Sequence, residues 1–360
     1  MRAWISAMGV VFPGGKGRQA FARAIVRGES LAKASRLRPE ILAAEMEENL
    51  KPLVERRGLA VLSRGAILAA AAIEDLAAAE PWLLEEQVRA ECALVVGTAF
   101  GHIASRAEFH QDARRNGARW VSPILFPNTI INSLAGHAAI LFGLSGPNST
   151  VTSGRRSGLE AVIRAATLLT AGRAPRVIVL GCDEVSQTSL RGLDSLREGA
   201  WDAPELAIPP GEAAGALLLE AAGPPPARSI GRLLGAAERS SVRKGVSRAV
   251  EEAMRAALAD AGVTANEITH LSLSGRYGGG IGQAEAEAAL AVFGGKTPRM
   301  CLQQVLGETF GAQGVLAIAA ELAVRNEAAS EFSPAAHWPE GPFLVSSAET
   351  TGATCAVVSV

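Results

Sequence analysis

Short runs of apolar residues, bounded by glycine, proline or polar residues, alternate along this chain with longer runs of helical periodicity. The apolar runs have the length and flanks of buried β-strands. The clearest are residues 92–97, 176–181, 215–220, 269–273, 342–347 and 354–360. Helices are expected at residues 65–79, 158–171 and 248–261. Because the two kinds of segment alternate, the pattern predicts an α/β layered fold.

The helix expected at residues 248–261 shows the pattern most clearly. Val250, Met254 and Leu258 form one apolar stripe, and Gly262 follows as a stop signal. The first 15 residues contain one short apolar run that ends at a proline and two glycines. They predict a first strand and a turn, because the run is too short for the core of a signal peptide or for a membrane span.

The order of elements is similar on the two sides of the segment 209–228. In that segment two proline clusters flank the run GEAAGALLLE, and each side contains a strand, a glycine turn and an alanine-rich helix. This similarity predicts two related halves, residues 1–222 and residues 223–360.

Composition and charge narrow the classes of function. Of the 360 residues 48% are hydrophobic and 20% are charged, and the formal net charge is −1 at pH 7. Without basic runs the chain offers no electrostatic footprint for nucleic acid. The four cysteines, at positions 92, 182, 301 and 355, show no CxxC spacing, so we expect reduced thiols in a cytoplasmic protein and neither a metal site nor a cofactor.

The most informative motif lies at residues 120–158. It reads WVSPILFPNTIINSLAGHAAILFGLSGPNSTVTSGRRSG, with a serine-proline start, an N-x-x-A-G-H segment and a GLxGP turn. In this order the three features resemble the β-ketoacyl-ACP synthase family. In that family the turn leads to a catalytic cysteine at the start of a buried helix, and a gap-free count places Arg155 at the cysteine's position. His137 falls on a histidine that is structural in the family, so core packing is its expected role.

Three further family motifs are altered in the same way. The HGTxT turn is matched by Ser274-Gly275 and the residues up to 278, so that Ser274 stands in place of the first histidine. In the third motif Gln303 replaces the lysine and Glu308 the second histidine, while the glycines remain. The family's GFGGTN gate loop corresponds to a segment that starts with Glu349, Thr350, Thr351 and Gly352.

Condensation in the family needs a thiolate and two imidazoles. An arginine at the cysteine position cannot attack a thioester, because its guanidinium stays protonated and only donates hydrogen bonds. A buried arginine is costly unless it is paired. In the family the residues aligned with Arg155 and Glu308 lie close together across the pocket. The resemblance therefore implies an ion pair between them that fills the old site, with side chains less than about 6 Å apart. The alternative is that the turn has rearranged and Arg155 is a surface arginine.

The resemblance covers nearly the whole chain and implies the thiolase fold, with five α-β-α-β-α layers and two pseudo-symmetric halves. It also implies a catalytically inactive subunit similar to the chain length factors of type II polyketide and aryl-polyene systems. Such a subunit forms a heterodimer with an active ketoacyl synthase, bounds its acyl tunnel and works with an acyl carrier protein. Candidate tunnel and interface residues are Phe126, Ile130 and Ile131. Chain length factors typically carry glutamine at the lost cysteine, whereas this chain has Arg155.

Two other functions stay open at this point. A diverged acyltransferase or thioesterase would use one of the serines Ser153, Ser157 or Ser274 together with Glu308, but a serine nucleophile needs an adjacent base. Alternatively, a homodimer would act as a pseudoenzyme that binds an acyl carrier protein. Its contacts with the acidic carrier would come from exposed arginines, for which the candidates are Arg106, Arg114 and Arg115.

Overall fold

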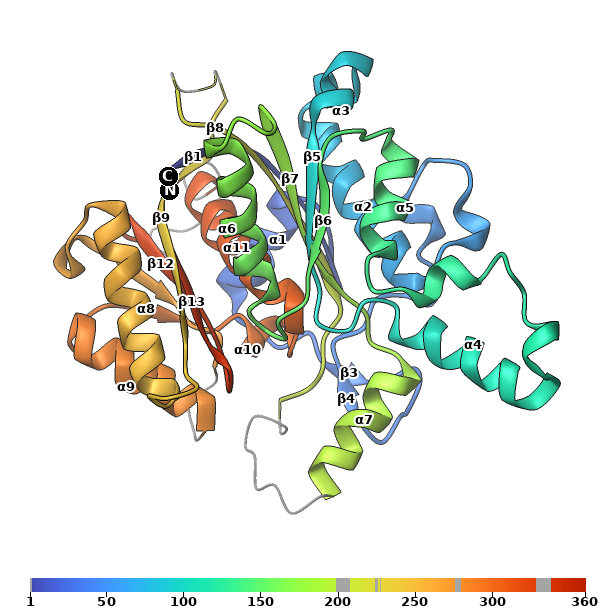
Figure 1. The fold of residues 1–360 in the computed structure, drawn as a ribbon. Coiled ribbons are helices and arrows are strands. Elements are labelled where there is room, and N and C mark those ends of the chain that lie inside the picture. Colours follow the sequence, from blue (N-terminus) through green and yellow to red (C-terminus); the bar gives the residue numbers. More distant parts are fainter. Residues whose placement is uncertain (1, 199–207, 224–225, 227, 276–279, 328–337) are drawn as a thin grey trace.

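The protein is described by a computed structural model that covers all residues except 1, 199–207, 224–225, 227, 276–279 and 328–337. Its main feature is an 11-stranded mixed sheet (Figure 1). The strands are β1 (Ala3–Phe12), β2 (Gly15–Lys16), β5 (Ala93–Gly97), β6 (Asn148–Val151), β7 (Arg176–Asp183), β8 (Ala213–Ala221), β9 (Gly231–Ser240), β10 (His270–Ser272), β11 (Arg299–Met300), β12 (Phe343–Glu349) and β13 (Gly352–Ser359). A separate hairpin joins β3 (Lys33–Ala34) and β4 (Leu42–Ala43).

The strand order shows a repeat. From the centre outward, the N-terminal part runs β1-β8-β7-β5-β6 and the C-terminal part runs β9-β13-β12-β10-β11. In both parts the first two pairings are antiparallel and the last two are parallel. β1 and β9 pair with each other and so join the two parts. The described strands therefore form two halves of matching topology, while the boundary between residues 222 and 223 stays a prediction.

Helices fill three layers around these two parts of the sheet (Figure 1). Their bounds are α1 (Arg18–Arg27), α2 (Arg64–Ala79), α3 (Glu86–Glu91), α4 (Ile103–Asn116), α5 (Ser133–Phe142), α6 (Ser157–Thr170), α7 (Gln187–Glu198), α8 (Val246–Ala261), α9 (Gly280–Phe293), α10 (Gln303–Leu306) and α11 (Gln313–Glu327). α6 and α11 lie in the middle and contact strands of both halves. α2 and α5 cover the outer face of one half, and α8 and α9 cover that of the other. The expected five-layered thiolase architecture is thus present.

Local sequence explains these elements. The six expected strands and three expected helices are all present, with ends within two residues of the expected bounds. In α8 the stripe Val250, Met254 and Leu258 is buried, and Gly262 ends the helix in a left-handed conformation with φ of 73°. β8 is buried over its first seven residues, as an apolar central strand should be. β9 was not predicted, because its run GRLLGAAERS mixes small and charged residues.

One side of the molecule differs from the rest. α4 has no buried residue and stands away from the sheet (Figure 1), and the chain then passes through exposed apolar positions. We call these the apolar segment: Trp120, Ile124, Leu125, Phe126, Ile130, Ile131 and Ile140. β6, at the edge of the sheet, follows α5 directly. Among the described residues no helix is long and apolar enough to cross a membrane.

Candidate functional site: a degenerate junction of the two halves

The candidate site lies where α6 and α11 begin, because the two middle helices meet there through glycine. A Cβ atom on Gly158 would lie 2.7 Å from the carbonyl oxygen of Gly311. A Cβ on Gly314 would lie 2.8 Å from the nitrogen of Leu159. Backbones at this distance exclude any side chain. The glycines of the family motifs therefore keep a packing role at this junction.

Arg155 and Glu308 form the expected ion pair at this junction. Nε of Arg155 lies 2.8 Å from Oε2 of Glu308, and the two side chains are 11% and 4% exposed. Oε1 of Glu308 accepts a hydrogen bond of 2.8 Å from the backbone nitrogen of Phe310. The alternative of a surface arginine is wrong. A buried ion pair is stable only with good geometry and additional hydrogen bonds. The bond from Phe310 meets this requirement, so the pair fills the junction between the two helices.

Gln303 joins the pair from α10. Its Nε2 donates to Oε2 of Glu308 at 2.6 Å and lies 3.5 Å from Oε1 of Gln313. Gln313 in turn donates to the carbonyl oxygen of Ser274 at 2.9 Å. The structure thus brings Arg155, Ser274, Gln303 and Glu308 into one buried network, although Arg155 lies more than 100 positions before the other three.

The hydroxyl of Ser274 contacts a different carboxylate from the one that the serine hypothesis required. It lies 3.2 Å and 3.3 Å from the two oxygens of Glu285, and it accepts from the backbone nitrogen of Ala348 at 2.9 Å. Burial raises the pKa of Glu285. Glu308 is engaged by Arg155 and Gln303 instead. The pairing of Ser274 with Glu308 is therefore wrong for this structure.

The other two candidate serines lie at the start of α6, with Ser153 in the turn before it and Ser157 as its first residue. Ser157 donates to the carbonyl oxygen of Gly154 at 2.7 Å and accepts from the nitrogen of Ser153 at 2.8 Å. These bonds fix the turn, and neither partner is a base. Of the described histidines, His102 bonds Ser63, His137 bonds Asn128 and His270 bonds Glu321. The serines of the site therefore have no hydrogen-bonded imidazole among the described residues.

The four thiols are buried and protonated. Burial raises the pKa of Cys301 to about 11 and the pKa of Cys92 and Cys355 to about 12. The pKa of Cys182 is raised well above its ordinary value for the same reason. Cys301 is close to the site, with its sulfur 3.9 Å from Oε1 of Gln303. Since the thiolate is the nucleophilic form, none of the four replaces the lost cysteine. Among the described residues no group of His, Cys, Asp and Glu could hold a metal ion.

The segment matched to the gate loop is a tight hairpin between β12 and β13. Glu349 and Gly352 form its closing pair, and Thr350 and Thr351 form its loop. Oε2 of Glu349 lies 3.5 Å from the backbone nitrogen of Arg155, so this residue contacts the turn before α6. The carbonyl oxygen of Thr350 accepts from the hydroxyl of Ser241. The hairpin is therefore tied to the chain on both sides.

A backbone ladder connects Glu308 to the N-terminal region. The nitrogen of Glu308 donates to the oxygen of Pro209, and the nitrogen of Gly211 donates to the oxygen of Glu308, both at 2.8 Å. On the other side of the same segment, the nitrogen of Ala44 donates to the carbonyl oxygen of Pro210, and the carbonyl oxygen of Ala44 accepts from the nitrogen of Glu212, both at 2.9 Å. Residues 209–212 are thus held between two parts of the chain.

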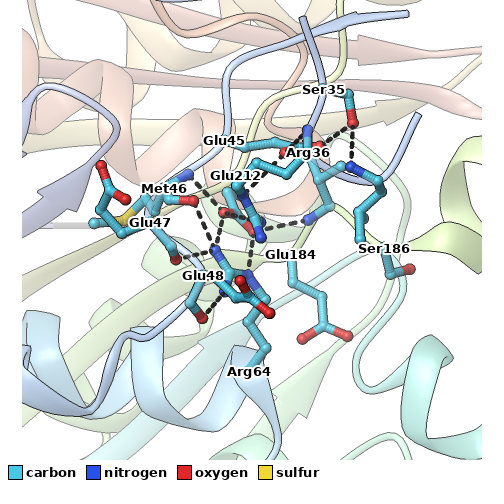
Figure 2. A network of polar contacts seen from close by, with 12 residues as sticks. Ser35, Arg36, Glu45, Met46, Glu47, Glu48, Arg64, Glu184, Ser186 and Glu212 are labelled. Carbon is cyan, nitrogen blue, oxygen red and sulfur yellow. Dashed lines mark hydrogen bonds and ion pairs between the residues drawn. The ribbon is translucent and has the colours of Figure 1, made fainter. Parts of the chain in front are cut away.

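Glu212 anchors this ladder in the network of Figure 2. Its buried carboxylate accepts from the nitrogen of Met46 at 2.7 Å and from Nε of Arg64 at 2.9 Å. Arg64 also donates to the carbonyl oxygens of residues 46–48. Beside it, Glu184 is buried, and its Oε1 has no hydrogen-bond partner among the described residues. Burial raises the pKa of Glu184 to about 7.

Sequence reasoning missed Glu285, Gln313 and Glu212. Glu285 and Gln313 lie three and two residues after a glycine, and polar side chains so close to buried glycines were a usable signal. The structure exposes the candidate tunnel and interface residues: Phe126 is 55%, Ile130 46% and Ile131 38% exposed. Whether they form an interface or line a tunnel stays a prediction.

Comparison with known proteins agrees with this architecture. The model of the β-ketoacyl synthase N-terminal domain matches residues 2–223, which is more than half of the chain. The chain therefore belongs to the β-ketoacyl synthase family.

Solved structures of this class superpose over the whole chain. The ishigamide ketosynthase/chain length factor is 26% identical, with a TM-score of 0.81 and 99% of both chains covered. A β-ketoacyl synthase from Burkholderia phymatum STM815 is 18% identical, with a TM-score of 0.82 and 99% and 98% coverage. At 18% identity, the match to the Burkholderia protein shows only that the two chains share the thiolase fold.

Curated relatives are more distant or match over less of their length. The 3-oxoacyl-[acyl-carrier-protein] synthase 2 of Vibrio cholerae is 30% identical over 103 residues, which are 29% of this chain and 25% of that protein. Nodulation protein E of Rhizobium sp. is 26% identical over 276 residues, which are 72% and 68% of the two chains. The chain thus spans about a quarter of the length of the first of these relatives.

Proposed function

We propose that this chain is a catalytically inactive ketosynthase-like subunit that pairs with an active ketoacyl synthase and bounds its acyl tunnel, as a chain length factor does. The observation that carries the proposal is the buried Arg155–Glu308 pair, which occupies the positions matched to the nucleophilic cysteine and a catalytic histidine. A cation and a carboxylate that neutralise each other supply neither a thiolate nor an imidazole. The similarity to the ishigamide ketosynthase/chain length factor supports the same function.

Two features of the chain's surface support the proposal that it binds a partner subunit. The apolar segment and the edge strand β6 adjoin each other in the sequence and in the fold. On β6 the hydroxyl oxygens of Ser149 and Thr150 are buried and have no hydrogen-bond partner among the described residues. An exposed strand edge invites pairing with another strand, and large apolar patches mark interfaces. An active ketosynthase that presents the same edge would cover both, with Phe126, Ile130 and Ile131 at the shared boundary of the tunnel.

Product length tests the proposal. The complex of this chain with its ketosynthase would be supplied with malonyl-loaded acyl carrier protein, and the acyl products would be sized by mass spectrometry. A Phe126→Ala substitution should lengthen the products, because it removes side-chain bulk at the boundary. Val242→Ala is the matched control, since Val242 is 82% exposed but lies in the turn after β9, outside the apolar segment. Products of unchanged length with Phe126→Ala, Ile130→Ala and Ile131→Ala would contradict the assignment of the tunnel.

A further inference from the structure

Asp183, the last residue of β7, is a buried carboxylate that no family motif discussed above includes. It is 1% exposed and accepts four hydrogen bonds. Its Oδ1 accepts from the hydroxyl of Thr98 at 2.7 Å and from the nitrogen of Phe100 at 3.0 Å. Its Oδ2 accepts from the nitrogens of Ala99 and Gly311, both at 2.8 Å. Both oxygens are therefore fully engaged.

The four donors come from both halves of the molecule. Thr98, Ala99 and Phe100 follow β5 in the N-terminal half, whereas Gly311 precedes α11 in the C-terminal half. The two backbones touch, because a Cβ atom on Gly311 would lie 2.4 Å from the nitrogen of Ala99. Water therefore has no room to satisfy these amides in place of the carboxylate, and an unpaired buried amide is costly.

We propose that these three backbone amides and the Thr98 hydroxyl form an anion hole that the chain fills with its own carboxylate, and that Asp183 thereby locks the two halves of the degenerate site together. Converging backbone N–H groups bind anions in many proteins. A hydrogen bond to a charged acceptor is also about twice as strong as one between neutral groups. Asp183 is a positioning residue in this account, since it acts on the site through the segments that it holds.

Phe310 and Gly311 connect Asp183 to the ion pair of Arg155 and Glu308. The nitrogen of Phe310 donates to Glu308, and the next residue, Gly311, donates to Asp183. Phe310 has a φ of 48°, which is unfavourable for an aromatic residue and persists only where the surroundings enforce it. Its ring packs edge-to-face on Phe100 at 4.7 Å, and Phe100 is held by the same carboxylate. Asp183 thus fixes both rings and the backbone beside Glu308.

Chemical rescue tests the anion hole. Asp183→Ala removes the carboxylate and leaves its four donors without a partner, so the thermal midpoint should fall by roughly 5–10 °C. Formate should restore the midpoint of this variant along a saturable curve, because it supplies the same two oxygens. Formamide, which has nearly the same shape but no charge, should not restore it. The measurement belongs at pH 8, because burial raises the pKa of Asp183 to about 6 and the carboxylate is ionised there.

Glu184→Ala is the matched control. It also removes a buried carboxylate, but Glu184 accepts from one amide, that of Gly65. Formate should therefore raise the thermal midpoint of Glu184→Ala by no more than it raises that of the unsubstituted protein. An unchanged midpoint in Asp183→Ala, or equal stabilisation of all three proteins by formate, would overturn the proposal.

A second variant covers the case in which Asp183→Ala does not fold. Asp183→Asn keeps the volume of the side chain but places an NH₂ group against backbone N–H donors. Its midpoint should be lower than that of the unsubstituted protein, and formate should not raise it, because the amide fills the hole. An Asp183→Asn protein as stable as the unsubstituted one would show that the charge is not needed, and so would also overturn the proposal.

Discussion

At the scale of single residues, the site is defined by charges that satisfy one another. Arg155 and Glu308 each leave a buried charge behind if the other is removed. Breaking a buried pair by removing one partner costs about 3–5 kcal/mol, whereas replacing both partners by apolar residues is often neutral. The pair is therefore expected to show strong coupling in stability measurements.

We expect Glu308→Leu alone to lower the free energy of unfolding by about 3–5 kcal/mol, because Arg155 loses its carboxylate. The double variant Arg155→Leu/Glu308→Leu should recover most of this loss. Urea unfolding of the two single variants and the double variant gives the coupling free energy. Arg255 and Glu251 on the surface of α8 are the control pair, and their coupling should be below about 1 kcal/mol. Additive effects at positions 155 and 308 would contradict the buried pair.

A thiol at the family's cysteine position should not restore chemistry. Arg155→Cys places a thiol in the turn before α6, where the helix N-terminus favours a thiolate. The neighbouring positions nevertheless hold Ser274, Gln303 and Glu308, and none of these supplies an imidazole. We predict no condensation of acyl and malonyl carrier proteins by this variant alone. Turnover above that of the unsubstituted protein would mean that the remaining groups are catalytic.

Glu184 should make stability fall as pH rises. Its folded pKa of about 7 exceeds the ordinary value of 4.5, so the native state binds more protons than the unfolded state between these values. Its destabilising effect is therefore absent below about pH 4.5 and complete above about pH 7. Glu184→Gln cannot ionise and should be more stable than the unsubstituted protein by about 3 kcal/mol at pH 8. The two proteins should have similar stability at pH 4.5. A Glu184→Gln variant that is less stable than the unsubstituted protein by the same amount at both pH values would refute this.

At the scale of elements, the apolar segment and β6 are the part of the chain that we propose contacts the partner subunit. Ile124→Glu places a charge in the apolar segment, where Ile124 is 68% exposed. The substitution should leave the fold intact and weaken association with the partner at least tenfold, because a partner would have to bury that charge. Leu290→Glu is the control, since Leu290 is 58% exposed but lies on α9. Gel filtration and circular dichroism separate the two effects, and equal binding by both variants would exclude this segment as the interface.

Elements were more predictable from sequence than the contacts between them. β5, β7, β8, β12 and β13 consist mainly of apolar or small residues and are nearly fully buried, so periodicity and flanking glycines were sufficient. The strand β9 was not predicted because its end contains the charged residues Glu238 and Arg239. It forms a strand because it pairs with β13, a tertiary contact that local sequence does not show. Within the site, the cost of burying an arginine predicted that Arg155 has a partner, and the family resemblance identified it as Glu308. Nothing in the sequence spacing indicated that Ser274 would contact Glu285.

At the scale of the whole molecule, the chain has the thiolase architecture with two halves of matching topology. The glycine contacts between α6 and α11 bring the two helices together where the candidate site lies. Polar residues that bond one another fill that place, while large exposed apolar side chains gather in the apolar segment. An apolar patch of this kind supports the partner that we propose.

The measurement that tests this most directly is the composition of the complex that the chain forms in its native host. The tagged protein would be purified, and everything that copurifies at near-equal stoichiometry would be identified by mass spectrometry. The account predicts one ketoacyl synthase with its cysteine and both histidines intact, in a one-to-one complex. Recovery of this chain alone as a homodimer, with acyl-transfer or thioesterase activity of its own, would contradict it.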